Sequence, residues 1–156
     1  MNKHAGTLSI HDAMTLRPIT VTPGATIGEL MEAFDRHDYN AFPVVDAAGA
    51  LRGIVTKLDV LRALRPVQDL ELPDLRAVGA RRVEDIMRPG VIAVEPEDPV
   101  VVAADLMVET RLRSLPVVRR SHGRPPVLVG IVSQGDLLRG LRFEMADVQL
   151  AGEGKR

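Results

Sequence analysis

The chain has 156 residues, of which 46% are hydrophobic, 26% are charged and only 3% are aromatic, a balance that excludes a disordered chain and suits one domain or two small units sharing a core. Its 20 Lys and Arg oppose 21 Asp and Glu, so no long-range field attracts nucleic acid or an anionic membrane. The absence of cysteine excludes disulfides, a thiolate nucleophile and cysteine-bound zinc or iron–sulfur clusters.

The first half of the chain predicts a strand, a helix, a hairpin and a second helix. The β-branched run 19–21 is typical of a short strand, and Thr26 with Glu29 has the capping-box spacing that begins a helix. Residues 42–46 and 51–56 flank a turn that contains a glycine, and they predict a β-hairpin. Helical patterning returns directly after this hairpin.

The second half follows a linker and repeats the same order. Residues 66–81 have two prolines and mixed polarity, which predicts a linker with room for one short helical turn. A β-branched run at 91–94 is followed by Asp98, the expected helix N-cap, and Pro99, the expected first helical residue. A second hairpin, and a helix that begins after Ser133, complete the copy.

The two halves are copies of one β-α-β-β-α unit. Met14 matches Met87 at an offset of 73 residues, whereas Asp59 matches Asp136 at an offset of 77. The second copy therefore carries four extra residues, which fall in the predicted hairpin tip at 119–129. We expect an α/β fold in which two small mixed sheets, flanked by helices, pack with pseudo-two-fold symmetry.

Each copy ends its second hairpin strand on a hydroxyl residue and places an aspartate three positions later. The pairs are Thr56 with Asp59 and Ser133 with Asp136. A helix begins at this hydroxyl, and its free N–H groups favour a phosphate or another anion. An ionised carboxylate can accept hydrogen bonds from both hydroxyls of a ribose, and neighbouring apolar strands can hold a base. The pattern therefore fits a nucleotide.

The same spacing also has a purely structural interpretation. A Thr or Ser followed three residues later by an acid is an ordinary capping box, in which hydroxyl and carboxylate bond the backbone at the helix start. Duplication does not separate the two interpretations, because a duplicated fold duplicates its helix caps. Both stay open from the residues alone.

Four motifs occur twice in the same order, over about 10–65 and 82–142: D-x-M, a β-branched run, L/F-P-V-V and G-I-V-T/S-x-x-D. No single motif is specific, but the ordered and repeated set resembles the cystathionine β-synthase (CBS) domain, here as a tandem pair. This resemblance implies a disc-like module with clefts between the repeats. Such clefts bind adenosyl compounds such as AMP, ADP, ATP or S-adenosylmethionine, and two modules often form a homodimer.

The resemblance assigns roles to particular residues. The hydroxyl of Thr56 or Ser133 would contact phosphate, and Asp59 or Asp136 would hold the ribose. The base-side wall would be formed in one copy by Ile19, Thr20 and Val21 with Ala41, Phe42 and Pro43. In the other copy it would be formed by Ile92, Ala93 and Val94 with Ser114, Leu115 and Pro116. Each hydroxyl–aspartate pair is expected to face the strands of the opposite copy.

The two predicted sites are not identical. Gly135 precedes Asp136, whereas the bulkier Leu58 stands at the matching place in the first copy. Arg113 can reach a phosphate as a fixed cation, or can lie on a solvated surface, whereas its counterpart Asn40 supplies no charge. We therefore expect different ligands, with the copy that carries Arg113 suiting the more phosphorylated one.

Other kinds of site lack sequence support. Four histidines are scattered without metal-ligand spacing, and the sequence shows neither a catalytic triad nor a glycine-rich phosphate loop. The basic stretch 111–124 lacks aromatic residues that could stack on bases. We expect no metal, no catalysis and no nucleic-acid partner.

Together these observations predict a regulatory CBS pair rather than an enzyme, with repeats at 10–65 and 82–145 joined by the linker 66–81. No segment approaches the ~20 apolar residues of a membrane helix, and the N-terminus lacks a secretory run, so we expect a cytoplasmic protein without a membrane partner. Its output would act on an unknown effector protein in trans. Two alternatives remain: an oligomerisation module with empty clefts, and a nucleic-acid-binding module.

Overall fold

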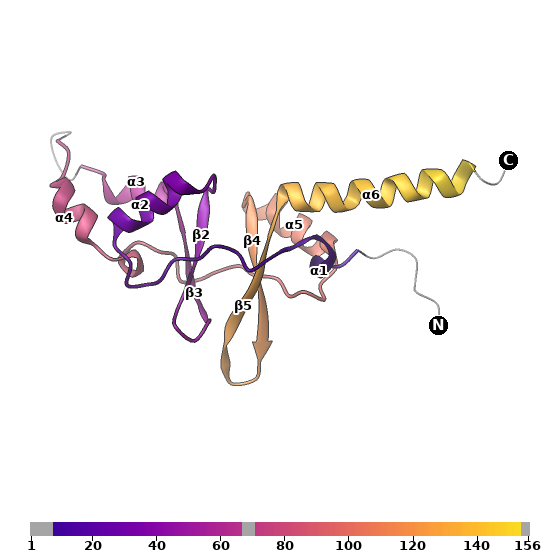
Figure 1. Cartoon of the computed structure of the whole chain (residues 1–156), viewed down its shortest axis with the longest axis horizontal. Helices are drawn as coiled ribbons and strands as arrows, with labels where there is room; N and C mark the ends of the chain where they lie inside the picture. Colours follow the sequence, from indigo (N-terminus) through magenta and orange to yellow (C-terminus); the bar gives the residue numbers. More distant parts are fainter. Residues whose placement is uncertain (1–7, 67–70, 154–156) are drawn as a thin grey trace. The chain divides into compact units, whose positions relative to one another are not determined.

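The computed structural model describes residues 8–66 and 71–153, with residues 147–153 in backbone only. The chain divides into two compact units, each with its own hydrophobic core (Figure 1). The first-copy unit consists of Ile19–Val91 with Pro125–Val127. The second-copy unit consists of Ile92–Arg124 and the chain from Leu128 onward, together with the N-terminal residues up to Pro18.

In the first-copy unit, an antiparallel hairpin leads directly into a helix. The elements are α2 (Ile27–Arg36), β2 (Ala41–Val45), β3 (Leu51–Thr56), α3 (Lys57–Ala63), α4 (Leu75–Ala80) and the 3-10 turn η1 (Val83–Asp85). Gly49 makes the turn between β2 and β3 at φ 82°, a left-handed conformation that glycine adopts readily. The predicted linker contains α4, more helix than the single turn expected; its residues 67–70 lie outside the described part.

In the second-copy unit, the matching hairpin is joined by a short third strand. The elements are α1 (Ile10–Ala13), β1 (Thr15–Leu16), α5 (Val100–Thr110), β4 (Ser114–Ser121), β5 (Arg124–Ser133) and α6 (Gln134–Glu153). The strand order is β1-β5-β4, and Gly123 stands at the hairpin tip with φ 71°. Both predicted hairpins are thus confirmed.

Each unit includes the segment that begins the other copy, which we call its leading segment. α1 and β1 begin the first copy, yet β1 pairs with β5, and Ile10 is fully buried in the second-copy core. Val83, at the start of the second copy, is likewise buried in the first-copy core, and Arg88 bridges to Ile54 of β3. The boundaries predicted from the sequence mark where the two copies begin and end. Their use as domain boundaries stays a prediction.

Aliphatic side chains dominate both cores. The first-copy core contains Ile27, Leu30, Phe42, Val44, Val55, Val60, Val78 and Val83. The second-copy core contains Ile10, Val94, Val100, Ala103, Met107, Leu115, Val117, Val132 and Leu137. Each fully buried aliphatic side chain stabilises the fold by roughly 1.5–3 kcal/mol. The strands that carry Thr56 and Ser133 are therefore held firmly at their ends.

Two helix starts test the capping predictions. Thr26 caps α2 as predicted, because its hydroxyl accepts the N–H of Glu29 at 3.1 Å and the Glu29 carboxylate accepts the N–H of Thr26 at 2.8 Å. The prediction for Asp98 is wrong: Pro99 is the N-cap, and α5 begins one residue later. The Asp98 carboxylate instead accepts the N–H of Glu95 at 2.8 Å and closes a tight turn before the helix.

The β-branched runs 19–21 and 91–94 make single bridges rather than full strands. Val21 pairs in parallel with Val44, and Val94 makes the matching bridge in the second copy. A proline stands two residues after each bridging valine, and it has no N–H with which to extend a ladder. The unit therefore keeps the predicted order, with its first strand reduced to one paired residue.

Candidate functional site

Thr56 and Asp59 form a complete capping box where β3 ends and α3 begins. Oδ2 of Asp59 accepts hydrogen bonds from the N–H of Thr56 at 2.9 Å and from its hydroxyl at 2.7 Å. The hydroxyl oxygen of Thr56 in turn accepts the N–H of Asp59 at 3.2 Å. Asp59 is only 4% exposed. The structural interpretation of the motif is thus realised, and it uses one of the two carboxylate oxygens.

Two arginines hold the other oxygen of this carboxylate. Oδ1 of Asp59 accepts hydrogen bonds from Nη1 of Arg62 at 3.1 Å and from Nε of Arg88 at 3.2 Å. The side chains of Arg62 and Arg88 are 54% and 47% exposed, whereas the carboxylate is buried. The arginines compensate a charge that would be costly to bury alone. Both arginine side chains therefore reach the buried carboxylate from the surface.

Ser133 and Asp136 repeat this geometry at the start of α6. Oδ2 of Asp136 accepts the N–H and the hydroxyl of Ser133, both at 2.8 Å, and the serine oxygen accepts the N–H of Asp136 at 3.1 Å. Oδ1 is bonded by Arg139, the counterpart of Arg62. Asp136 is 8% exposed. Both aspartates therefore use Oδ2 for the cap and Oδ1 for arginine.

The two aspartates differ in how many arginines they hold. Arg88 has Thr15 as its counterpart at the repeat offset of 73 residues, and Thr15 lies in β1 opposite Ile131. Among the described residues, Oδ1 of Asp136 is therefore paired with one arginine, and Oδ1 of Asp59 with two. The first copy is the more cationic at its aspartate.

Arg113 and its counterpart Asn40 contact the two helix starts through their backbone carbonyls. The carbonyl of Arg113 accepts the N–H of Gln134 at 3.0 Å, and the carbonyl of Asn40 accepts the N–H of Lys57 at 3.2 Å. Arg113 is exposed, and its side chain forms no hydrogen bond or ion pair within the described part of the chain. A contact between Arg113 and a ligand phosphate stays a prediction.

Gly135 is not required by the space around it. A Cβ atom at this position would lie 3.7 Å from the hydroxyl oxygen of Ser133, which is ordinary van der Waals contact. The difference between Gly135 and Leu58 is therefore not imposed by packing within the second-copy unit. An effect of this difference on ligand choice stays a prediction.

The segments predicted to form each base-side wall lie next to each other within one unit. In the first-copy unit, Ala41 pairs with Thr56 across the hairpin, and the N–H of Val21 donates to the carbonyl of Pro43 at 3.0 Å. In the second-copy unit, the N–H of Val94 donates to the carbonyl of Pro116 at 3.1 Å. Whether each pair faces the strands of the opposite copy concerns both units jointly and stays a prediction.

Burial divides the predicted wall residues into two groups. The buried ones are Phe42, Pro43, Val94, Leu115 and Pro116. Those that keep accessible surface are Ile19, Thr20, Val21, Ala41, Ile92, Ala93 and Ser114. A ligand base could therefore meet the second group directly, and the first group only through backbone atoms.

The sequence analysis missed the arginines that bind the aspartates. Arg62 and Arg139 each stand three residues after the aspartate of their copy, so the extended spacing T/S-x-x-D-x-x-R was a readable signal. No local spacing indicated Arg88. This residue belongs to the leading segment of the second copy, and it contacts Asp59 because that segment packs in the first-copy unit. Long-range contacts of this kind do not follow from local spacing.

In the described residues, no group of three His, Cys, Asp or Glu side chains is placed to hold a metal ion. Nor does any helix in the described part of the chain have the length and apolar character needed to cross a membrane.

The duplicated motif and fold agree with a known family. The model of the CBS domain matches the chain twice, over residues 10–66 and 83–142. The chain belongs to the CBS domain family. The CBS domain-containing protein YhcV of Bacillus subtilis (strain 168) is 32% identical over 130 residues, which cover 83% of this chain and 82% of YhcV.

Solved structures of other CBS proteins share the fold of this CBS pair. The CBS domain pair of protein MJ0100, in complex with 5′-methylthioadenosine and S-adenosyl-L-methionine, superposes with a TM-score of 0.68 at 28% identity, covering 86% of this chain and 95% of that one. CBSX2 in complex with AMP gives a TM-score of 0.69 at 27% identity, covering 92% and 98%. The predicted fold, a tandem CBS pair, is confirmed.

Some relatives of this CBS pair are enzymes. A homoserine O-acetyltransferase of Methanococcoides burtonii is 30% identical over 84% of this chain, but the match covers only 24% of the enzyme. The similarity is thus confined to a minor part of that protein.

Proposed function

We propose that this CBS pair is a regulatory module, not an enzyme, that binds an adenosyl compound such as AMP, ADP, ATP or S-adenosylmethionine. The observation that supports this most is the duplicated strand-to-helix junction, where a hydroxyl and a buried aspartate recur at a helix start in both copies. The adenosyl compounds bound by the CBS pair of MJ0100 and by CBSX2 give further support.

One aspartate can cap a helix and bind a ligand at the same time, because each role uses a different carboxylate oxygen. Oδ2 of Asp59 stays in the capping box, while Oδ1 is the acceptor for the ribose hydroxyls. The incoming diol displaces Arg62 and Arg88 from Oδ1, and the released guanidinium groups are then free to pair with phosphate. Asp136 and Arg139 act in the same way in the second copy.

The proposed output is a change in conformation that a partner protein recognises. A ligand can shift a conformational equilibrium only by the difference between its affinities for the two states. Displacement of Arg88 supplies such a difference, because Arg88 ties the segment after η1 to α3. The effector acts in trans in this account, and the protein is cytoplasmic.

We further propose that the chain forms a homodimer. Leu58 and Leu61 on α3 are exposed, and so is Leu138 on α6, the counterpart of Leu61. Exposed apolar side chains at matching places in both copies support a contact surface. An oligomerisation module with empty clefts would use the same surface, so ligand binding has to be tested separately.

Isothermal titration calorimetry with AMP, ATP and S-adenosylmethionine tests the ligand proposal. At least one of the three should bind, and Asp59→Asn and Asp136→Asn should each weaken binding at the altered site by about 10- to 100-fold, the effect of losing a hydrogen bond to a charged group. Asparagine keeps one oxygen for the cap and puts an N–H donor where Oδ1 accepted. The cap survives while the diol acceptor is lost.

Glu29→Gln is the matched control for these variants. Glu29 belongs to the capping box of α2, which contains no predicted ligand residue. Its replacement should leave all titrations unchanged. No binding heat and no thermal shift with any of the three compounds would favour the oligomerisation module instead.

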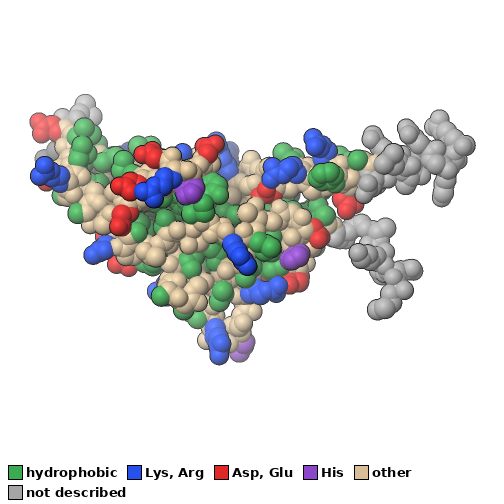
Figure 2. Space-filling view, viewed as in Figure 1, with side chains coloured by type: hydrophobic (Ala, Val, Ile, Leu, Met, Phe, Trp, Pro, Cys, Tyr) green, Lys and Arg blue, Asp and Glu red, His purple; other side chains and the backbone are tan. Residues whose placement is uncertain are grey.

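A nucleic-acid-binding module is the other alternative. On the face drawn in Figure 2, acidic and basic side chains are interspersed rather than gathered by sign. The face shown therefore has no extended basic surface of the kind that a nucleic acid needs. Nucleic-acid binding that weakens steeply with salt and survives both asparagine variants would support the alternative.

A further inference from the structure

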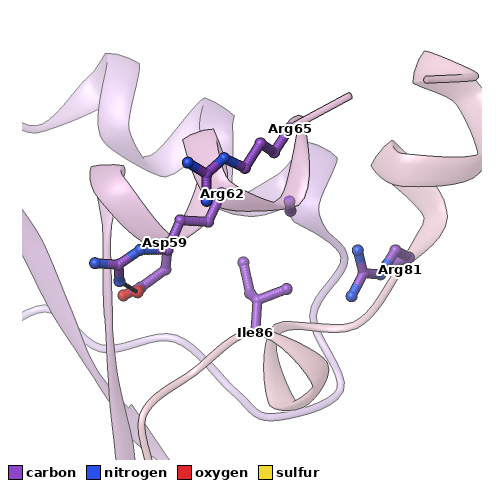
Figure 3. Close-up of a pocket in the computed structure, with 6 residues that line it drawn as sticks. Asp59, Arg62, Arg65, Arg81 and Ile86 are labelled. Carbon is purple, nitrogen blue, oxygen red and sulfur yellow. Dashed lines mark hydrogen bonds and ion pairs between the residues drawn. The ribbon is translucent and has the colours of Figure 1, made fainter. Parts of the chain in front are cut away.

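A hollow in the first-copy unit is bordered by arginines that the proposed nucleotide contacts do not all use. Its volume is about 370 Å³, and it is lined by Asp59, Arg62, Ala63, Arg65, Arg81 and Ile86. Figure 3 shows Arg81 pointing into it from the end of α4, opposite Asp59 and Arg62, with Ile86 between them. We call this hollow the Arg81 pocket.

The charges of the Arg81 pocket are not balanced. Arg62 pairs with Asp59. Arg65 and Arg81 form no hydrogen bond or ion pair through their side chains with any residue in the described ranges. Three arginines thus line one space beside a single carboxylate that Arg88 already shares. A bound anion would balance the positive charge of this lining.

The internal repeat shows which residue of the second-copy unit corresponds to Arg81. The carbonyl of Arg81 accepts the first N–H of α2, from Ile27, at 2.9 Å, and the carbonyl of Leu8 accepts the first N–H of α5, from Val100, also at 2.9 Å. Leu8 and Arg81 are therefore equivalent in both sequence offset and backbone contact. One copy carries an aliphatic side chain where the other carries a cation.

In the second-copy unit, the space equivalent to the pocket is filled. Leu8 packs against Gly140 so closely that a Cβ atom on this glycine would lie 2.7 Å from Cδ2 of Leu8 and 3.7 Å from Cβ of Ala13. Leu8 and Ala13 both pack on the second-copy core. The first copy has Ala63 in place of Gly140 and Arg81 in place of Leu8, so the pocket is a feature of this copy and not a consequence of the repeated fold.

We propose that the Arg81 pocket binds a small anion with at least two negative charges carried on phosphate groups. Guanidinium groups bind phosphate oxygens in pairs, and three of them suit a group that presents several such oxygens. The apolar floor formed by Ala63 and Ile86 excludes water from one side of the bound group. A volume near the lower end of known ligand pockets, about 300–1,000 Å³, fits a diphosphate-sized group.

The phosphate groups can come from two sources, which experiment separates. They belong either to a free ion or to the phosphate tail of a nucleotide whose ribose is held by Asp59. Only the second source rests on the proposed function, because Asp59 borders both the pocket and the helix start. The pocket itself is defined by Arg65 and Arg81, which take no part in the capping box.

Titration with inorganic pyrophosphate alone, at a fixed ionic strength of about 0.15 M so that screening is constant, tests the pocket directly. Arg81→Leu copies the residue that the second-copy unit carries at this place, and Arg65→Gln is the second variant. Each should weaken pyrophosphate binding by about tenfold or more, the effect of losing one charge-assisted contact. Arg142→Gln, the counterpart of Arg65, is the matched control and should bind pyrophosphate as the unaltered chain does.

The outcomes separate the two sources and the failure of the proposal. If the source is a free ion, pyrophosphate binds and Arg81→Leu leaves the affinity for ATP unchanged. If it is a nucleotide tail, Arg81→Leu weakens ATP more than AMP. The proposal is overturned if Arg81→Leu and Arg65→Gln leave the affinities for both pyrophosphate and ATP unchanged. It is also overturned if Arg142→Gln weakens binding as much as these two variants do. Absence of any adenosyl ligand would defeat the proposed function but leave the pyrophosphate result to stand.

Discussion

At the scale of single residues, the aspartates carry two separable tasks. Oδ2 of Asp59 closes the capping box and Oδ1 binds arginine, and Asp136 divides its oxygens in the same way. The capping box could be predicted from the three-residue spacing, because caps depend on local geometry. The burial of both carboxylates could not, since it depends on segments far away in the sequence.

Asp59→Ala should destabilise the fold more than Asp136→Ala. We expect the free energy of unfolding to fall by about 1–3 kcal/mol for Asp59→Ala, from the lost cap and from the lost tie between Arg88 and α3, and by about 1 kcal/mol for Asp136→Ala. Urea unfolding followed by circular dichroism measures both values. Equal losses would show that the Arg88 contact adds no stability.

At the scale of elements, the glycine of each G-I-V motif lies where a leading segment packs closely against the second hairpin strand. A Cβ atom on Gly53 would lie 2.8 Å from the carbonyl oxygen of Arg88 and 2.8 Å from Sδ of Met87. On Gly130 it would lie 2.9 Å from the carbonyl oxygen of Thr15. These motif glycines are thus explained by the close approach of another backbone segment.

Gly53→Ala should destabilise the first-copy unit, because the carbonyl of Arg88 cannot move away without losing its bridge to Ile54. We expect a loss of about 1–3 kcal/mol, typical of overpacking. The control is Gly79→Ala in α4, where a Cβ atom would meet nothing within 4 Å. That change should stabilise the protein by about 0.4–1 kcal/mol. Thermal unfolding of the two variants should therefore shift in opposite directions.

The elements themselves were largely predictable from the sequence, and their errors have local causes. Both hairpins and the α2 cap follow from glycine-containing turns and capping-box spacing. The start of α5 was misplaced by one residue because Asp98 bonds backward to Glu95. The exchange of leading segments was not predictable, since Ile10 and Val83 have the same apolar character whichever core they enter.

At the scale of the whole molecule, the two copies contain candidate sites that differ in charge. Comparison of the two copies in the sequence predicted the more phosphorylated ligand for the second copy, because that copy carries Arg113. The structure adds cations to the first copy: Arg88 stands where the second copy has Thr15, and Arg81 where it has Leu8. Arg88 lies in an exchanged leading segment and Arg81 directly before it, so a comparison restricted to the motif missed them. The arginines around Asp59 make the first copy a second candidate for the more phosphorylated ligand, and both assignments stay predictions.

A crystal structure of the CBS pair grown with AMP, and in turn with S-adenosylmethionine, tests the central claim most directly. The account predicts that, in at least one copy, a ribose hydroxyl lies at a hydrogen-bond distance of about 2.7 Å from Oδ1 of Asp59 or Asp136, with the arginine displaced and Oδ2 still in the capping box. Electron density for a ligand elsewhere, or for no ligand while both Oδ1 atoms keep their arginines, would contradict it.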